Sequence, residues 1–179
     1  MITIDKQKQL ARDVLETTQG HIPGSIIAGG APRNWYANKL ANDIDIFCPG
    51  KNHDFKFLAD ELGIEITKKT KEETLDYALF VVWEAEIEEE TIQWICFPDR
   101  ERWQTATDFV LESFDFNICK CFFEDGNIVL TKLAQDDFDN KTLSFSMKSI
   151  LKNKRSQTLH TRAEKMKNIF PDYQIMILE

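Results

Sequence analysis

The sequence predicts an α+β fold, with a mixed β-sheet flanked by helices and a helical C-terminal segment. The chain has 179 residues, enough for one domain with a short appendage. Apolar residues make up 42% of it, which is enough to form a core. Helical and strand-like patterns alternate early in the chain, and strand-like patterns dominate its middle. We expect a main domain over 1–145 and a helical segment packed on it over 146–179.

The first third of the chain alternates helices and short strands. Leu10, Val14 and Leu15 recur near helical spacing, and Gly63 follows a later apolar helical pattern as a stop signal. The expected elements are a helix over 6–18, a strand over 25–28, a helix over 32–40, a strand over 43–48, a helix over 53–62 and a β-like stretch over 64–67.

The middle of the chain is rich in β-branched and aromatic residues. We expect a hairpin of strands 77–85 and 91–97, joined by the acidic loop 86–90. There follow an expected helix over 99–111, a strand over 114–123, a hairpin turn at 124–127, a return strand over 128–130 and a helical stretch over 149–169.

The charge is distributed unevenly along the chain. The net charge is -8, yet the segment from Lys141 to Phe170 holds eight basic residues and one acid. A basic segment on an acidic body is consistent with a phosphate-binding surface, and equally with a solvated amphipathic helix.

The sequence contains no sign of export or membrane insertion. No apolar run approaches the ~20 residues that span a bilayer, and the N-terminus lacks a signal-peptide pattern. The four cysteines form no close metal-binding pairs and are expected to be buried thiols. We therefore expect a cytoplasmic protein, of a bacterium or a phage-infected cell, with no membrane partner.

Two carboxylates mark the first candidate site. Asp43 and Asp45 lie two apart on an expected strand, so both side chains point to one face. Adjacent carboxylates repel each other unless a cation neutralises them, and hard cations such as Mg²⁺ prefer oxygen ligands. For an isolated Asp-x-Asp pair, a turn cap and a solvent-facing acid are the commoner explanation.

A glycine pair precedes these carboxylates. Gly29 and Gly30 stand where a strand meets a helix, a place where backbone N–H groups can approach a phosphate. Arg33, one helical turn further on, could add a charged donor. A simple strand-to-helix turn is the alternative explanation of the glycines.

A third acid lies in a later apolar run. Asp115 stands between Phe114 and Phe116, and strand alternation would place it on one face with Asn117 and Cys119. A buried carboxylate needs a partner, which metal coordination would supply. An exposed acid on an edge strand is the alternative.

These motifs together resemble a known family. Gly29-Gly30-Ala31-Pro32-Arg33, followed by Asp43-Ile44-Asp45, resembles the head domain of tRNA CCA-adding enzymes and bacterial poly(A) polymerases, within the DNA polymerase β-type nucleotidyltransferase superfamily. The later Phe114-Asp115-Phe116 is similar to the third carboxylate strand of that superfamily and to small phage-encoded nucleotidyltransferases. Asn34 departs from the pattern, since the family commonly has Asp after the Arg.

The resemblance implies a nucleotidyltransferase fold and two-metal nucleotidyl transfer. Asp43, Asp45 and Asp115 would bind Mg²⁺ or Mn²⁺, and Gly29, Gly30 and Arg33 would contact a nucleoside triphosphate. Arg162 and Lys165 lie three apart on the expected C-terminal helix and are further candidates for triphosphate or acceptor contacts.

The acceptor stays open at this point. An RNA 3′ end, a small molecule or a protein hydroxyl would each suit the chemistry, and in 179 residues we expect no room for the large helical body that holds tRNA in CCA-adding enzymes. The alternatives to an enzyme are a catalytically silent nucleotide- or nucleic-acid-binding module, and a phage-type interaction or inhibitor protein on the same fold.

Overall fold

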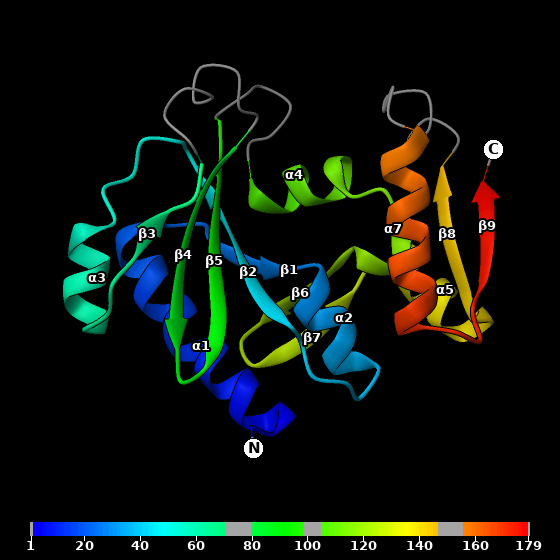
Figure 1. Cartoon of the computed structure of the whole chain (residues 1–179), viewed down its shortest axis with the longest axis horizontal. Helices are drawn as coiled ribbons and strands as arrows, with labels where there is room; N and C mark the ends of the chain where they lie inside the picture. Colours follow the sequence, from blue (N-terminus) through cyan, green and yellow to red (C-terminus); the bar gives the residue numbers. More distant parts are fainter. Residues whose placement is uncertain (1, 71–79, 99–104, 147–155, 179) are drawn as a thin grey trace.

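A computed structural model describes residues 2–70, 80–98, 105–146 and 156–178 (Figure 1). The helices are α1 (Ile4–His21), α2 (Gly30–Tyr36), α3 (Lys56–Leu62), α4 (Ala106–Ser113), the 3₁₀ helix η2 (Asn117–Cys119), α5 (Lys132–Asn140) and α7 (Ser156–Ile169). The strands are β1 (Ile26–Ala28), β2 (Asp43–Pro49), β3 (Thr67–Lys68), β4 (Val81–Ile87), β5 (Glu90–Phe97), β6 (Cys121–Glu124), β7 (Asn127–Leu130), β8 (Thr142–Ser146) and β9 (Gln174–Leu178).

Seven strands form one mixed sheet in the order β3-β4-β5-β2-β1-β6-β7. The central strands β2 and β5 run parallel, and every other neighbouring pair is antiparallel. This arrangement confirms the predicted α+β fold with a mixed sheet flanked by helices. It also places β2, which carries both candidate carboxylates, in the middle of the sheet.

Both faces of the sheet carry a hydrophobic core. On one face, side chains of α1, α2 and α3 pack against Ile44 and Ile46 of β2. On the other face, α4 packs against Phe47 and its neighbours. Because side chains alternate along a strand, Asp43 and Asp45 lie on the same face as Phe47, the face that α4 covers further along β2.

Two tight turns account for the hairpins that the sequence predicts. Glu88 and Glu89 join β4 to β5 with φ of 52° and 70°, and Asp125 and Gly126 join β6 to β7 with φ of 48° and 78°. Two successive residues with positive φ are typical of type I′ hairpin turns. Both hairpins are confirmed, and the first has a shorter loop than the acidic run 86–90 indicates.

The C-terminal part contains more than the predicted helix. Strands β8 and β9 form a separate parallel pair, and α5 precedes β8. A third core joins η2, β8 and α7 through residues such as Ile118, Phe145 and Met166. The prediction omitted β9 because parallel pairing with a strand some 30 residues earlier leaves no local signal.

Helix boundaries differ from the predicted ones for local reasons. Thr3 caps α1 by accepting a hydrogen bond from the Lys6 backbone, and α1 therefore begins earlier than residue 6. Helix α2 ends at Tyr36, because Asn38 adopts a left-handed φ of 57°. Thr105 begins α4 with a capping box. The predicted starts of three elements, at 77–79, 99–104 and 149–155, lie outside the described residues.

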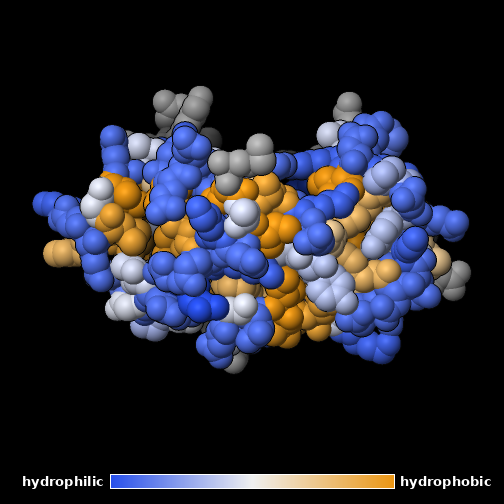
Figure 2. All heavy atoms as spheres, turned by 90° about the horizontal axis from the view of Figure 1, so that it is seen from below, coloured by the Kyte–Doolittle hydropathy of each residue, from blue (hydrophilic) through white to orange (hydrophobic). Residues whose placement is uncertain are grey.

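Hydrophobic residues also reach the surface. Figure 2 shows them in the central part of the lower face, between polar flanks. Val129 of β7 and Leu133 of α5 are among the exposed large side chains. Within the described part of the chain, no helix is long and apolar enough to cross a membrane.

Candidate active site

The turn between β1 and α2 requires glycine at its first position. Gly29 has φ +84°, and a Cβ added there would lie 2.7 Å from the Phe114 ring. Its N–H donates to the Cys121 carbonyl at 3.0 Å, which ties the turn to β6. Gly29 therefore shapes the turn, and the N–H groups that begin α2 start at Gly30.

Strand β2 places the first carboxylate beside this turn. A Cβ added at Gly30 would lie 3.8 Å from Oδ1 of Asp43 and 4.0 Å from Nη2 of Arg33. The predicted Gly30, Arg33 and Asp43 therefore meet at the start of α2. Asp43 is partly buried, as is Asp45 two residues further along the same face of β2.

Asp45 is held in an unfavourable environment for a carboxylate. Burial, and next the neighbouring charge of Asp43, raise the pKa of Asp45 to about 7. Lys165 and Arg33 lower the pKa in part, so both cations act on this carboxylate. Two adjacent acids with a raised pKa are an arrangement that a bound cation would relieve.

Arg33 is buried and fully engaged at the base of the site. Its Nε and Nη2 donate to Oδ1 of Asn34 at 3.0 and 2.8 Å. Its Nη1 donates to the sulfur atoms of Cys119 and Met166 at 3.2 and 3.3 Å. Asn34 also donates to the Leu40 carbonyl. The residue that departs from the family pattern thus supplies the oxygen that orients Arg33.

Asp115 does not lie on a strand, which corrects the prediction. It follows α4 in a bend, Phe116 makes an isolated bridge to Phe145, and η2 begins at Asn117. Asn117 donates to Ser144 Oγ at 3.0 Å, which draws the segment toward β8. The strand predicted over 114–123 therefore begins only at Cys121, as β6. An alternating apolar pattern does not distinguish a strand from a 3₁₀ turn that packs between two cores.

Helix α7 brings the predicted basic residues to the acids. Arg162 forms an ion pair with Asp115, whose side chain is buried. One helical turn on, the charge of Lys165 acts on Asp45, and Met166 contacts Arg33. Residues of α2, β2 and α7 thus lie near one another, and Arg162 ties Asp115, which precedes η2, to the helix that also carries Lys165.

Sequence reasoning missed Lys120 in this neighbourhood. Burial lowers the pKa of Lys120, and the negative charge of Asp115 partly offsets that effect. Its position between two cysteines in an apolar run is the one sequence feature that would have indicated it. Cys119 and Met166, which accept hydrogen bonds from Arg33, carried no such signal.

The acids do not gather as a set of three. Among the described residues, no three His, Cys, Asp or Glu side chains lie close enough together to hold a metal ion. The Asp43–Asp45 pair is adjacent, whereas Asp115 has Arg162 as its partner.

Solved structures with this fold were found by comparison. A CCA-adding enzyme in complex with CTP has a TM-score of 0.71 and 15% identity, over 97% of this chain and 42% of that one. A tRNA-processing enzyme in an apo form has a TM-score of 0.67 and 17% identity, over 94% and 43%. The Thermotoga maritima CCA-adding enzyme in complex with tRNA has a TM-score of 0.66 and 17% identity, over 94% and 38%.

These structures are longer than the chain, which spans about two fifths of each. No protein-family model matches the sequence, and no curated protein matches it. The shared feature is the three-dimensional arrangement of the sheet and its helices, over nearly the whole chain. The chain therefore has the nucleotidyltransferase fold of the CCA-adding enzymes.

Proposed function

We propose that this protein is a metal-dependent nucleotidyltransferase, which moves a nucleoside monophosphate from a nucleoside triphosphate to a hydroxyl group. The observation that carries the proposal is that the Asp43 carboxylate lies beside the turn at Gly30. Asp45 lies two residues further along the same strand face, where the positive charge of Lys165 acts on it. A phosphate-binding turn and a cation-binding pair of acids are the two parts that nucleotidyl transfer needs side by side.

The residues suit a divalent cation. Asp43 and Asp45 are partly buried oxygen ligands on one face of β2, and burial with mutual repulsion raises the pKa of Asp45 to about 7. Mg²⁺ or Mn²⁺ held by this pair would lower the pKa of the attacking hydroxyl and offset phosphate charge. Supporting examples are the CCA-adding enzymes of this fold, whose structures contain ATP or CTP.

The triphosphate would lie against the start of α2. The backbone N–H groups of Gly30 and Ala31 would donate to it, since Pro32 has no N–H and the Arg33 N–H donates to the Gly29 carbonyl, and the positive end of the helix favours an anion there. Lys165 is exposed on α7 and is available to neutralise phosphate charge. Arg33 donates its hydrogen bonds to Asn34, Cys119 and Met166 inside the protein, so its proposed role is to brace the turn and add positive potential.

Asp115 and Arg162 would exchange partners during the reaction. Arg162 is half-exposed while Asp115 is buried, so the arginine is the member of the pair that can move. With Arg162 turned to the triphosphate, Asp115 would act as a third oxygen ligand of the cation and would accept the hydroxyl proton. The acceptor oxygen bonds to the α-phosphorus, the bond to the bridging oxygen breaks, and pyrophosphate leaves.

Nucleotide binding tests the proposal most directly. Calorimetric titration with ATP and CTP should show binding that depends on Mg²⁺ or Mn²⁺ and that Asp45→Ala abolishes. Asp60→Ala, which removes an exposed acid from α3, is the matched control and should bind as the wild type does. Metal-independent binding that survives Asp45→Ala would show that the acid pair is not a cation site.

Turnover and acceptor class need a second experiment. Nucleoside triphosphates labelled in the α-phosphate are incubated with the protein, Mn²⁺ and separate pools of RNAs, small alcohols and proteins. Label should enter one pool, and an RNA 3′ end is our first expectation because structures of this fold include a complex with tRNA.

The Arg162–Asp115 ion pair also suits a silent binding module. An arginine that permanently neutralises the third acid would leave a protein that binds nucleotide without transferring it. Metal-dependent binding with no label in any pool would favour this second function.

A further inference from the structure

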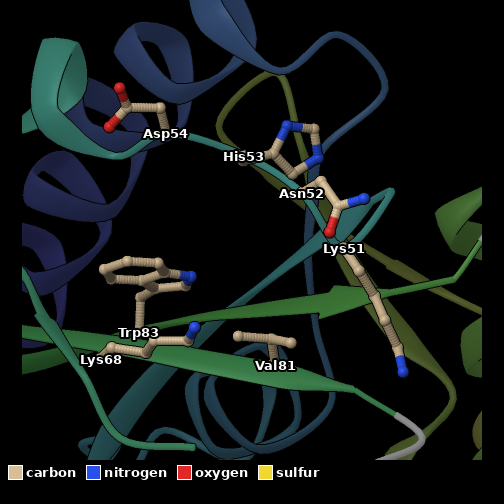
Figure 3. A pocket seen from close by; sticks show the side chains of 7 residues that line it. All are labelled: Lys51, Asn52, His53, Asp54, Lys68, Val81 and Trp83. Atoms are coloured by element: carbon tan, nitrogen blue, oxygen red, sulfur yellow. The ribbon is translucent and has the colours of Figure 1, made fainter. Parts of the chain in front are cut away.

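A surface pocket lies away from the candidate active site. Its volume is about 740 Å³, and its lining comes from the segment after β2 and from strands β3 and β4. Figure 3 shows Trp83 and Lys68 on one side of it and the stretch from Lys51 to Asp54 on the other. The proposed catalytic residues do not line it.

The pocket combines positive charge with an aromatic ring. Lys51, Lys68 and His53 line it together with one acid, Asp54, on a protein whose net charge is -8. The Lys68 ammonium lies 5.6 Å from the centroid of the Trp83 ring. Such an exposed cation–π contact is weak, so the ammonium is easily drawn to a phosphate.

The ring of Trp83 is held in a fixed position. Phe55, which is buried, stacks on it with ring centroids 4.9 Å apart and an interplanar angle of 28°. His53 packs edge-on against Phe55 and hydrogen-bonds through Nε2 to the Pro49 carbonyl at 2.5 Å. A supported ring costs little conformational entropy when a second ring stacks on it.

Trp83 also offers an unsatisfied donor. Its indole N–H is buried and has no hydrogen-bond partner in the described part of the chain. The nitrogen-bearing edge of the ring faces the other lining residues in Figure 3. The nearby Lys68 ammonium is itself only a donor, so it cannot satisfy this N–H.

We propose that this pocket binds one nucleotide unit of a single-stranded nucleic acid, with the base against Trp83 and the phosphate between Lys51 and Lys68. Stacking on a supported aromatic ring beside basic side chains is how proteins bind unpaired bases without reading their sequence. A duplex would not fit this mode, because its bases already stack on one another.

The pocket is independent of the acid pair. Register pairs Trp83 with Trp94 and Trp94 with Ile46, so Trp83 lies on the opposite face of the sheet from Asp43 and Asp45. The segment after β2 begins beyond Pro49, about 20 Å along the strand from Asp43. Binding here should therefore persist when catalysis or nucleotide binding at the acids fails.

Tryptophan fluorescence tests the proposal in buffer with EDTA, which keeps metal from the acid pair. A single-stranded 12-mer RNA should quench the fluorescence, AMP should do so more weakly, and duplex RNA should not. Trp83→Phe keeps a ring against Phe55 but offers less stacking area, so it should weaken binding of a fluorescein-labelled 12-mer in an anisotropy titration, whereas Asp45→Ala should bind the 12-mer as the wild type does. A single-stranded DNA 12-mer should quench as the RNA does, because the proposed stacking and phosphate contacts do not involve the sugar.

Charge reversal supplies the second measurement. Lys51→Glu combined with Lys68→Glu should weaken binding of the 12-mer by about tenfold or more at low salt. The control combines Lys6→Glu with Lys132→Glu, which changes the net charge by the same amount. Both residues lie in the first turn of a helix, α1 and α5, where the helix dipole favours an acid. This control should leave the affinity for the 12-mer unchanged. Unchanged affinity in the pocket variant, equal quenching by duplex RNA, or displacement of the RNA by poly-glutamate would each overturn the proposal.

Discussion

Replacing Asp45 by Asn should make the metal-free protein more stable. The pKa of Asp45 rises from 3.8 to about 7 on folding, chiefly through burial and then through the charge of Asp43. At about 1.4 kcal/mol per pKa unit, the ionised carboxylate costs the folded state about 4 kcal/mol above pH 7. Asn has nearly the same shape and no charge, so the free energy of unfolding should rise by up to that amount.

The sign of the pH dependence makes the prediction specific. A raised carboxyl pKa destabilises the folded state progressively as pH rises from 3.8 to about 7. The advantage of Asp45→Asn should therefore be about 4 kcal/mol at pH 8 and only about 1.6 kcal/mol at pH 5. Urea unfolding followed by circular dichroism at both pH values measures it.

A control variant and a nucleotide-binding measurement complete the test of Asp45→Asn. Asp60→Asn on α3 removes an exposed acid and should change stability little at either pH. The same Asp45→Asn protein should lose Mn²⁺-dependent nucleotide binding, so stability and binding change in opposite directions. A variant that is less stable than wild type at pH 8, or a difference that does not depend on pH, would refute the electrostatic reasoning.

Three further substitutions test the turn, its arginine and the α7 pair. Gly29→Ala should destabilise by about 2–4 kcal/mol, because it adds a Cβ 2.7 Å from the Phe114 ring at a φ of +84°; thermal unfolding measures this. Asn34→Ala should cost about 2–3 kcal/mol in urea unfolding, because two donors of the buried Arg33 lose their acceptor. Arg162→Met should tighten Mn²⁺ binding and weaken triphosphate binding in calorimetry; weaker binding of both would mean that its acidic partner is no metal ligand.

Much of the fold could be predicted because its signals are local. Positive-φ turns at Glu88–Glu89 and Asp125–Gly126 join strands that are adjacent in the sequence, and β-branched or aromatic runs mark those strands. The parallel β8–β9 pair was missed, since among the described strands β9 pairs with one that lies about 30 residues earlier in the chain. The pattern of apolar side chains in a segment indicates which of them are buried, but it does not indicate which other strand the segment pairs with.

The sequence by itself determined the Gly29–Gly30 turn and the shared face of Asp43 and Asp45, since a strand-to-helix turn and strand periodicity are properties of a short segment. Only the tertiary structure decided the partners of these residues. Asp115 lies in a bend, not in a strand, and pairs with Arg162. Arg33 is buried and donates hydrogen bonds to Asn34 and Met166. The Arg162–Asp115 and Arg33–Met166 contacts join segments more than 40 residues apart, and packing of α7 against the rest of the chain sets them.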